Sequence, residues 1–381
     1  MLVLIFTLDY EIHGNGEGCP YELMVEPTDR LLRLFDEYGA KLTIMADVAE
    51  ILKFKEYKEQ FGRDDYHYDR IVEQLRRAIQ TGHDVQLHIH SSYFNAQFGE
   101  GRWSQDWSEY NFAGLPYERM AWMIGTGKKY LEELLRPVDA GYRCLAFRAA
   151  NWSVSPSRNV IRSLLDHGIR IDTSVFKYGR RNGLAKFDYT HAHSALRPWR
   201  ANLDDICQQD ESSQLWEFPI HSDLRWIGAF LSANRIYRAV QTYRHRLVVP
   251  QTLPPNAVVG ALSGPRGIRK RLERLVGRHA WKADFNQCSG KQLIRAVKRA
   301  DREFGSAAIR LPLVLIGHSK LITHLNEWSL RPFLSFIGPG PESLSYGRFA
   351  DFEPQMASFD RNDPSSEVVR VPSPNSVPSS R

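Results

Sequence analysis

Short apolar runs alternate with amphipathic stretches of helical spacing along most of this 381-residue chain. The first run, Leu2–Leu8, is nearly continuous and ends in acidic residues, which is typical of a parallel strand that is buried on both faces. Strands that alternate with helices form right-handed βαβ units around a parallel sheet. The pattern therefore predicts an α/β fold, and roughly six or seven such units fit a barrel better than an open sheet.

The same periodicities give the expected elements. The expected strands are Leu2–Leu8, Lys41–Ala46, Thr81–His90, Cys144–Arg148, Gly168–Val175, Leu215–Ile220 and Leu311–Ile316. The expected helices are Thr28–Tyr38, Tyr68–Gln80, Glu118–Leu135, Ser155–His167 and Ser289–Phe304. We expect Thr28 and Ser155 to cap their helices at the N-terminal end.

We expect one catalytic domain over residues 1–349. Within it, residues 226–283 are punctuated by Pro and Gly and read as an irregular, basic insertion. Residues 350–381 are rich in Pro and Ser and lose all periodicity, so we expect a disordered tail.

Composition narrows the class of protein. Hydrophobic residues make up 43% and charged residues 25% of the chain, as in ordinary soluble enzymes. The four cysteines form no CxxC pair, which favours a reducing compartment. The N-terminal apolar run begins without a basic segment and is too short for a signal peptide or a membrane span. We therefore expect a cytoplasmic protein, while its oligomeric state stays open.

The net charge of +6 is unevenly distributed. Much of the excess lies in the stretch Arg266–Arg299, which is either a solvated helix face or a contact for an anionic membrane, a lipid-linked sugar or a nucleotide-linked sugar. Nucleic acid is not an expected partner, because no recognisable nucleic-acid module accompanies the charge.

Polar residues gather at the ends of the expected strands, where the active sites of parallel barrels lie. Asp9 and Glu11 follow the first strand and project to the same face in extended geometry. Two carboxylates this close repel each other unless a cation neutralises them or one takes up a proton. The pair indicates a metal site or, as the simpler alternative, a helix cap or surface turn.

A histidine pair ends the third strand. His88 and His90 are two residues apart, so both imidazoles fall on one face and suit zinc or another borderline metal. A lone strand histidine is more often a hydrogen-bonded structural residue, and we expect that of His83. We predict that His88 and His90 form a ligand pair.

Two later strands end in further candidates. Arg148 closes the run CLAFR and needs a carboxylate partner, either Asp9 or Asp172, because an unpaired buried guanidinium is costly. Trp152 follows and either walls a sugar site or packs in the core. His318 follows LPLVLI and is placed to protonate a leaving amine, or else to cap the next helix.

Together these motifs resemble the polysaccharide deacetylases with NodB homology, which include carbohydrate esterase family 4. The matching segments are FTLDYE at Phe6–Glu11, GHDVQLHIHS at Gly82–Ser91, FRAANW at Phe147–Trp152 and LIGHSK at Leu315–Lys320. The resemblance extends from Leu2 to Leu325. It implies a distorted (β/α)7 barrel and the metal-assisted removal of an N- or O-acetyl group from a sugar. The pattern is most similar to the WbmS-like branch, which is associated with the synthesis of O-antigen and other surface polysaccharides.

The resemblance also implies roles for single residues. Asp9 matches the catalytic base and His88 the first metal-binding histidine. Arg148 matches the residue that orients the base, and His318 the residue that protonates the leaving group. The expected substrate-binding residues, with less specific support, are Trp152, Asp172 and Glu217.

The chain departs from the family pattern at two positions. Tyr10 stands where the family has a metal-binding Asp, and Ser92 stands where it has the second metal-binding His. Glu11 and His90, each two residues from a matched position and on the same face, are the expected substitutes. The expected ligands of a divalent metal, foremost Zn²⁺, are therefore Glu11, His88 and His90.

The sequence thus predicts a carbohydrate deacetylase that acts on an N-acetylated sugar. The alternatives are a metal-free amidohydrolase or a glycosidase on the same barrel, and a carbohydrate-binding protein that has lost catalysis. The loop Ser91–Pro116 is rich in aromatic residues and is expected to set specificity.

Overall fold

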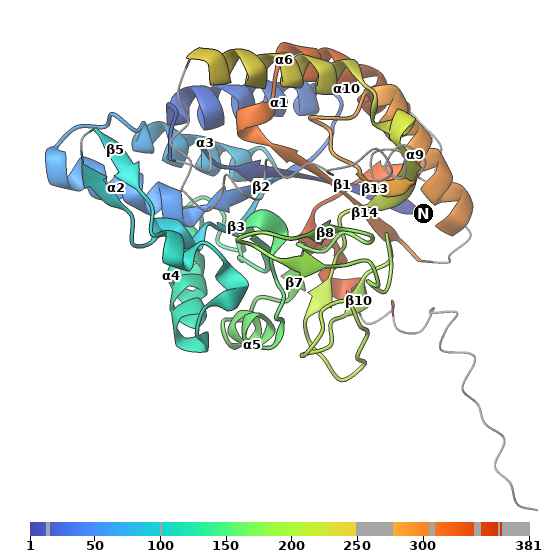
Figure 1. The fold of residues 1–381 in the computed structure, drawn as a ribbon, viewed down its shortest axis with the longest axis horizontal. Helices are drawn as coiled ribbons and strands as arrows, with labels where there is room; N and C mark the ends of the chain where they lie inside the picture. Colours follow the sequence, from blue (N-terminus) through green and yellow to red (C-terminus); the bar gives the residue numbers. More distant parts are fainter. Residues whose placement is uncertain are drawn as a thin grey trace, which may run out of the picture.

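A curled parallel sheet forms the centre of the computed structural model, which describes residues 1–12, 16–99, 101–248, 277–304, 309–338, 344–356 and 359. Seven of its parallel strands are β1 (Leu2–Tyr10), β2 (Leu42–Asp47), β3 (Asp84–Ile89), β6 (Ala146–Ala149), β7 (Ile171–Asp172), β11 (Trp216–Glu217) and β14 (Leu311–His318). They are hydrogen-bonded in the order β11-β7-β6-β3-β2-β1-β14. Figure 1 shows β1, β2, β3 and β14 in the middle of the molecule, with helices on either side.

The two ends of this strand order meet just after β11. Ile220 forms an isolated parallel bridge with Val314 of β14, and the amide of His221 donates to the carbonyl of Val314 at 3.0 Å. This contact closes the sheet into the distorted (β/α)7 barrel that the sequence predicts. The β11–β14 seam is narrow, whereas β1 and β14 pair along their whole shared length, from Leu2 to Asp9.

Helices cover the outside of the barrel. They are α1 (Glu26–Glu37), α2 (Val48–Phe61), α3 (Tyr68–Gln80), α4 (Tyr117–Leu135), α5 (Arg158–Asp166), α6 (Ala233–Val248), α9 (Gly290–Phe304) and α10 (His324–Ile337). Side chains of β1 alternate between the barrel interior and this helical layer. Phe6 points outward, with its ring centroid 4.8 Å from that of Phe35 on α1 and 5.9 Å from that of Phe333 on α10.

Five helices lie where the sequence predicts them, but two expected caps are wrong. Thr28 is inside α1, because the helix continues directly from a π-helical turn at Tyr21–Val25 and needs no cap there. Ser155 lies outside the helix that it was expected to cap, because Ser157 occupies the N-cap position. Helix α5 accordingly begins only at Arg158.

The described parts of segment 226–283 are regular, so the expectation of an irregular insertion is wrong for them. Strand β12 (Ser222–Trp226) pairs antiparallel with β13 (Arg278–Lys282), and α6 lies between them in the chain. Trp281 of β13 is buried, and its burial anchors the pair to the core. Residues 249–276, with the first part of the basic stretch, lie outside the described residues.

The barrel core extends past residue 349. A 3₁₀ helix covers Phe349–Gln355, and the rings of Phe349, Phe352 and Phe359 lie 5.8, 5.7 and 6.1 Å from that of Phe218. The first ten residues of the expected tail therefore include core residues, because their aromatic side chains pack on the barrel. The remainder of that tail, residues 360–381, lies outside the described part.

Smaller strands edge the barrel. They are β4 (Gln97–Gly99) with β5 (Arg102–Ser104), β8 (Arg180–Arg181) with β9 (Phe187–Asp188), β10 (Trp199–Arg200) beside β11, and β15 (Leu344–Tyr346) beside β1. None of the helices described is long and apolar enough to cross a bilayer.

Candidate metal centre and active site

Four potential metal ligands meet where β1, β2 and β3 end. Glu11 directly follows β1, Asp47 ends β2, His88 lies in β3 and His90 directly follows it. One donor atom from each residue lies within 4.8 Å of the other three, and all four side chains are buried. The structure thus brings together the three ligands expected from the sequence and adds Asp47.

The ring of His88 is fixed in one orientation and one tautomer. Its Nδ1 lies 2.9 Å from the carbonyl oxygen of Arg148. Because a carbonyl only accepts, Nδ1 carries the proton. Nε2 faces Glu11 Oε2 at 3.3 Å. Metal-binding histidines are usually held in this way, with the second ring nitrogen donating to a backbone or carboxylate oxygen, so His88 presents Nε2 as a donor.

His90 is held between two carboxylates. Its Nδ1 lies 2.5 Å from Asp47 Oδ2 and 3.3 Å from Glu11 Oε2. Burial lowers the pKa of both histidines, but the neighbouring carboxylates outweigh it and raise the pKa of His88 and of His90. A cluster that holds protons through excess carboxylate charge also attracts a divalent cation.

Asp47 is the ligand candidate that sequence reasoning missed. It caps α2, since its Oδ1 accepts from the amide of Ala49 at 3.2 Å, and it also accepts from the amide of His90 at 3.3 Å. The available signal was its place at the end of the second apolar strand, equivalent to that of Asp9 at the end of the first.

Glu11 carries a full negative charge in this cluster. Lys320, a second residue that sequence reasoning missed, places Nζ 2.8 Å from Glu11 Oε1 and donates to the carbonyl of Ile12 at 2.8 Å. Burial opposes ionisation of Glu11, but Lys320 and the two histidines hold its pKa well below the usual value. Oε1 is thus engaged by the ammonium, and Oε2 is left for the histidine side.

The side chains at the two positions that depart from the family pattern interact with other residues. The charged groups that act on the hydroxyl of Tyr10 are Asp29 and Arg77 of the surrounding helices, so its ring faces the helical layer. Ser92 donates to Gln105 at 2.8 Å. Neither side chain belongs to the four-residue cluster.

A second row of polar groups lies beside the first. Arg148, with no exposed surface, donates from Nη1 to Asp9 Oδ1 at 2.6 Å and from Nε to the carbonyl of Thr173 at 2.9 Å. Its carboxylate partner is therefore Asp9 rather than Asp172. Burial raises the pKa of Asp9, but Arg148, His88 and His318 together outweigh it and hold that pKa below the usual value.

His318 faces the free oxygen of this base. Its Nε2 lies 3.6 Å from Asp9 Oδ2, and its amide donates to Asn286 Oδ1 at 2.5 Å. Its Nδ1 is buried and has no hydrogen-bond partner in the described part of the chain. Burial lowers the pKa of His318 despite the nearby carboxylates, so the imidazole is neutral near pH 7.

Trp152 stands over this row. Its ring centroid lies 6.0 Å from that of His318, at an interplanar angle of 87°. Asn151 and Trp152 have φ values of 56° and 57°, a left-handed conformation that costs energy in residues other than glycine. The strained turn positions the indole beside His318, where it can wall a substrate site.

Asp172 and Glu217 lie elsewhere. Both have no exposed surface, and their carboxylates accept from the amides of Ser174 at 3.0 Å and Val175 at 3.1 Å. Burial raises the pKa of both groups, that of Glu217 strongly. These contacts brace β7 and β11, and the expected role of both carboxyls in substrate binding stays a prediction.

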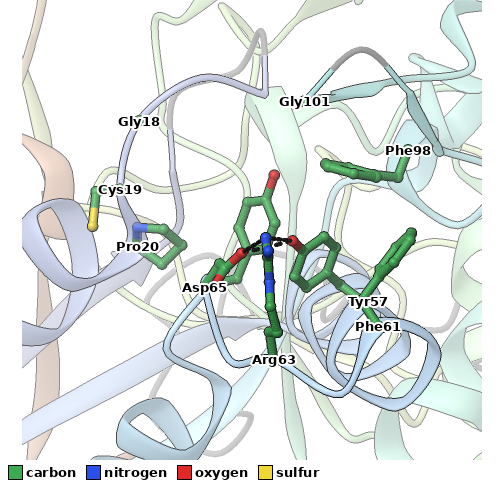
Figure 2. Close-up of a pocket in the computed structure, with 10 residues that line it drawn as sticks. Gly18, Cys19, Pro20, Tyr57, Phe61, Arg63, Asp65, Phe98 and Gly101 are labelled. Carbon is green, nitrogen blue, oxygen red and sulfur yellow. Dashed lines mark hydrogen bonds and ion pairs between the residues drawn. The ribbon is translucent and has the colours of Figure 1, made fainter.

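A cavity of about 580 Å³ lies apart from these residues. Figure 2 shows Cys19 and Pro20 on one side of it and Tyr57, Phe61 and Phe98 on the other. Its remaining lining residues are Gly18, Arg63, Asp65, Tyr66 and Gly101. No member of the four-residue cluster lines this cavity, and neither does Asp9, Arg148 or His318, so it is separate from the candidate active site.

No protein-family model matches the chain, and no curated protein matches it by sequence. Its structure is similar to those of two proteins assigned as polysaccharide deacetylases. The protein from Mycobacterium smegmatis shares 14% identity with a TM-score of 0.48, covering 94% of this chain and 91% of its own. The protein from Pseudomonas aeruginosa PAO1 shares 14% identity with a TM-score of 0.46, covering 93% and 92%.

The chain is similar to the same degree to a 4-alpha-glucanotransferase from Thermococcus litoralis. The identity is 14% and the TM-score 0.47, over 93% of this chain and 40% of the longer enzyme. Similarities of this size do not identify the reaction. A proposal for the reaction must therefore be argued from the geometry of the chain's own site.

Proposed function

We propose that this chain is a metal-dependent hydrolase that removes an acetyl group from an N-acetylated sugar, in the synthesis of a surface polysaccharide. The observation that carries the proposal is the convergence of Glu11, Asp47, His88 and His90 on one point, beside a base that is held by a buried arginine. The motif resemblance to the polysaccharide deacetylases supports the substrate class.

The cluster fits a divalent metal. It offers two imidazoles and two carboxylates, a mixed nitrogen and oxygen set that suits Zn²⁺ and similar borderline ions. The hydrogen bond from His88 to the Arg148 carbonyl leaves Nε2 directed at the cluster. A metal held here would polarise an amide carbonyl and make water a stronger acid.

Proton movement falls to the residues of the second row. Asp9 is ionised, held by Arg148, and takes the proton of the attacking water through its free oxygen. His318 is neutral at rest, so the proton that it gives to the departing amine must reach it during the reaction. Asp9 Oδ2, 3.6 Å from His318 Nε2, is the source. One proton thus passes from water through Asp9 and His318 to the amine.

A glycosidase mechanism fits the site less well. It requires a carboxylic acid whose raised pKa keeps a proton ready for the leaving oxygen. Among the described residues, the carboxyl groups with a raised pKa are Glu50, Asp84, Asp172 and Glu217. Glu50, Asp172 and Glu217 have no exposed surface, and Asp84 lies at the start of β3, at the opposite end of the strand from the site, so none is placed to hand a proton to a sugar.

The test measures metal content and product release together. Purified wild-type protein, loaded with Zn²⁺, Co²⁺ or Ni²⁺ and desalted, is expected to retain about one metal ion per chain and to release acetate from N-acetylated glucosamine oligomers. The double variant His88→Ala/His90→Ala is expected to lose both properties. His324→Ala, whose side chain is 84% exposed, is the control and is expected to keep both.

Each readout separates one alternative. Reducing ends released without acetate would show a glycosidase. Acetate release that survives exhaustive chelation would show a metal-free amidohydrolase. Metal retained equally in the double variant would refute the ligand assignment.

A further inference from the structure

Lys282 ends β13 and lies beside the active site, between two aromatic rings. Its Nζ lies 3.4 Å from the ring centroid of Trp152 and 4.5 Å from that of Phe176. Trp152 in turn contacts His318, with 6.0 Å between ring centroids. A positive charge therefore stands one ring away from the residue that delivers the proton to the leaving group.

Asp284 and Asp9 are the two carboxylates that raise the pKa of Lys282, but both accept hydrogen bonds from other groups. Asp284 accepts from the amides of Asn286 and Gln287 at 3.0 and 3.1 Å, and Asp9 is bound by Arg148. Among the residues that the structure describes, none forms a hydrogen bond or an ion pair with the ammonium of Lys282, which contacts the two rings instead.

A bound anion would stabilise the charged form of an ammonium in this position. Burial lowers the pKa of Lys282 to about 8, against the opposing effect of Asp284 and Asp9. Contact with aromatic faces offsets only part of what the desolvation of a charge costs. The side chain is only half-buried, so an incoming group can reach it.

We propose that Lys282 binds an anionic group of the substrate close to the acetyl group that is removed, so that the sugar acted upon is acidic. The shared chemistry is an anionic oxygen, which belongs either to the carboxylate of a sugar acid or to a phosphate ester that joins the sugar to a carrier. The inference rests on the proposed function for the identity of the site, but its test needs only binding.

The experiment compares three probes by calorimetric titration. They are N-acetylglucosamine, N-acetylglucosamine 1-phosphate and N-acetylglucosaminuronic acid. At least one acidic probe is expected to bind wild-type protein about 10- to 100-fold more tightly than the neutral sugar, the advantage of a hydrogen bond between charged groups. The acidic probe that shows the advantage identifies the source of the charge.

Variants assign the advantage to one side chain. Lys282→Met is expected to bring the acidic-to-neutral affinity ratio close to one while leaving the affinity for the neutral sugar unchanged, and Lys282→Arg to keep most of the ratio. Lys186→Met, at an exposed lysine between β8 and β9, is the matched control and is expected to keep the wild-type ratio. Should Lys282→Met fail to fold, Lys282→Gln is expected to lower the same ratio, because it also removes the charge.

The proposal is overturned if no acidic probe binds more tightly than the neutral sugar, or if the full advantage persists in Lys282→Met. Its failure is distinct from that of the proposed function. If wild-type protein releases acetate but Lys282→Met keeps the wild-type affinity ratio, only the role of Lys282 is refuted. The opposite result is that Lys282→Met loses the preference for the acidic probe while wild-type protein neither releases acetate nor binds metal. That result would support the acidic-sugar site and refute the deacetylase assignment.

Discussion

Glu11 lies 2.8 Å from Lys320 and 3.3 Å from each of His88 and His90. Each buried charge in this cluster thus has at least one partner of opposite sign. Removing one partner of a buried pair leaves the other uncompensated, which typically costs about 3–5 kcal/mol of folding free energy. Substitutions that keep the shape of the side chain therefore disturb the folded site least in tests of single residues.

Asp47 is the ligand most open to such a test. We expect Asp47→Asn to weaken metal binding about 10- to 100-fold, because the amide remains an acceptor for the α2 amide but loses the charge that attracts a cation. Competition with a chromogenic chelator measures the affinity. Burial and nearby carboxylates raise the pKa of Glu50 well above its usual value, and Glu50→Gln keeps the shape of the side chain and the acceptor for the amide of Ile12. This control is expected to leave the affinity close to that of wild type, and an equal loss in both variants would contradict the assignment.

His318 is expected to affect turnover alone. We expect His318→Ala to lower kcat about 10²- to 10⁴-fold, the range for loss of a general acid, while the protein retains its metal, since His318 is not in the four-residue cluster. Acetate release and metal analysis on the same preparation check both parts. Wild-type turnover in the variant would exclude His318 from the proton path.

At the scale of elements, the end of β14 is positioned by close packing against the segment before α9. A Cβ added to Gly317 would lie 2.2 Å from ring atoms of Phe285, and Phe285 itself packs on Phe6 at 5.8 Å. We expect Gly317→Ala to cost about 1–3 kcal/mol of unfolding free energy, as overpacking does in well-filled cores, and to reduce activity by displacing His318. Urea denaturation gives the first quantity.

The control for that experiment is Gly183→Ala, since a Cβ there would meet nothing within 4 Å. Exposed substitutions of this kind usually change stability by less than about 0.5 kcal/mol. Equal effects of the two substitutions would show that the contact with Phe285 does not position β14.

Strands β7 and β11 are joined by a carboxyl pair whose titration affects stability. Asp172 and Glu217 are partners in the register of these strands, and burial raises the pKa of Glu217 well above 4.5. The folded protein therefore keeps a proton that the unfolded chain gives up. The stability that this proton contributes is fully present below the unfolded pKa and is lost as the pH rises through the folded pKa.

Glu217→Gln keeps an acceptor and a donor but has no proton to lose. We expect this variant to gain unfolding free energy relative to wild type as the pH rises from about 5 to about 9. Denaturation at several pH values measures the difference, and parallel pH profiles would show that Glu217 does not hold its proton.

For the whole molecule, metal binding at the strand ends is expected to stabilise the barrel. A ligand present at 100 times its Kd adds about 2.7 kcal/mol to the free energy of unfolding, enough to raise Tm by a few degrees in a chain of this size. We expect Zn²⁺ to give this increase and a chelator to reverse it. The variant His88→Ala/His90→Ala should show no increase, and an equal shift in both proteins would point to binding elsewhere.

The barrel was predictable because each buried parallel strand is a continuous apolar run with its polar residues at one end. Helix α2 was not, since Lys53, Lys55 and Lys58 interrupt the periodicity of its apolar face. Asp47 stands alone on its strand and gains its partner only when β2 and β3 pair, with Asp47 opposite His88. Lys320 reaches Glu11 from a 3₁₀ turn after β14, and no local pattern signals a contact of that kind.

The buried arginine serves the two halves of the site through different atoms. Its guanidinium holds Asp9, whereas its backbone carbonyl fixes the ring of His88. Any amino acid at position 148 would supply that carbonyl, but only arginine supplies the guanidinium that binds Asp9. A substitution at position 148 would therefore leave Asp9 without its cationic partner, while the carbonyl that orients the ring of His88 stays in place.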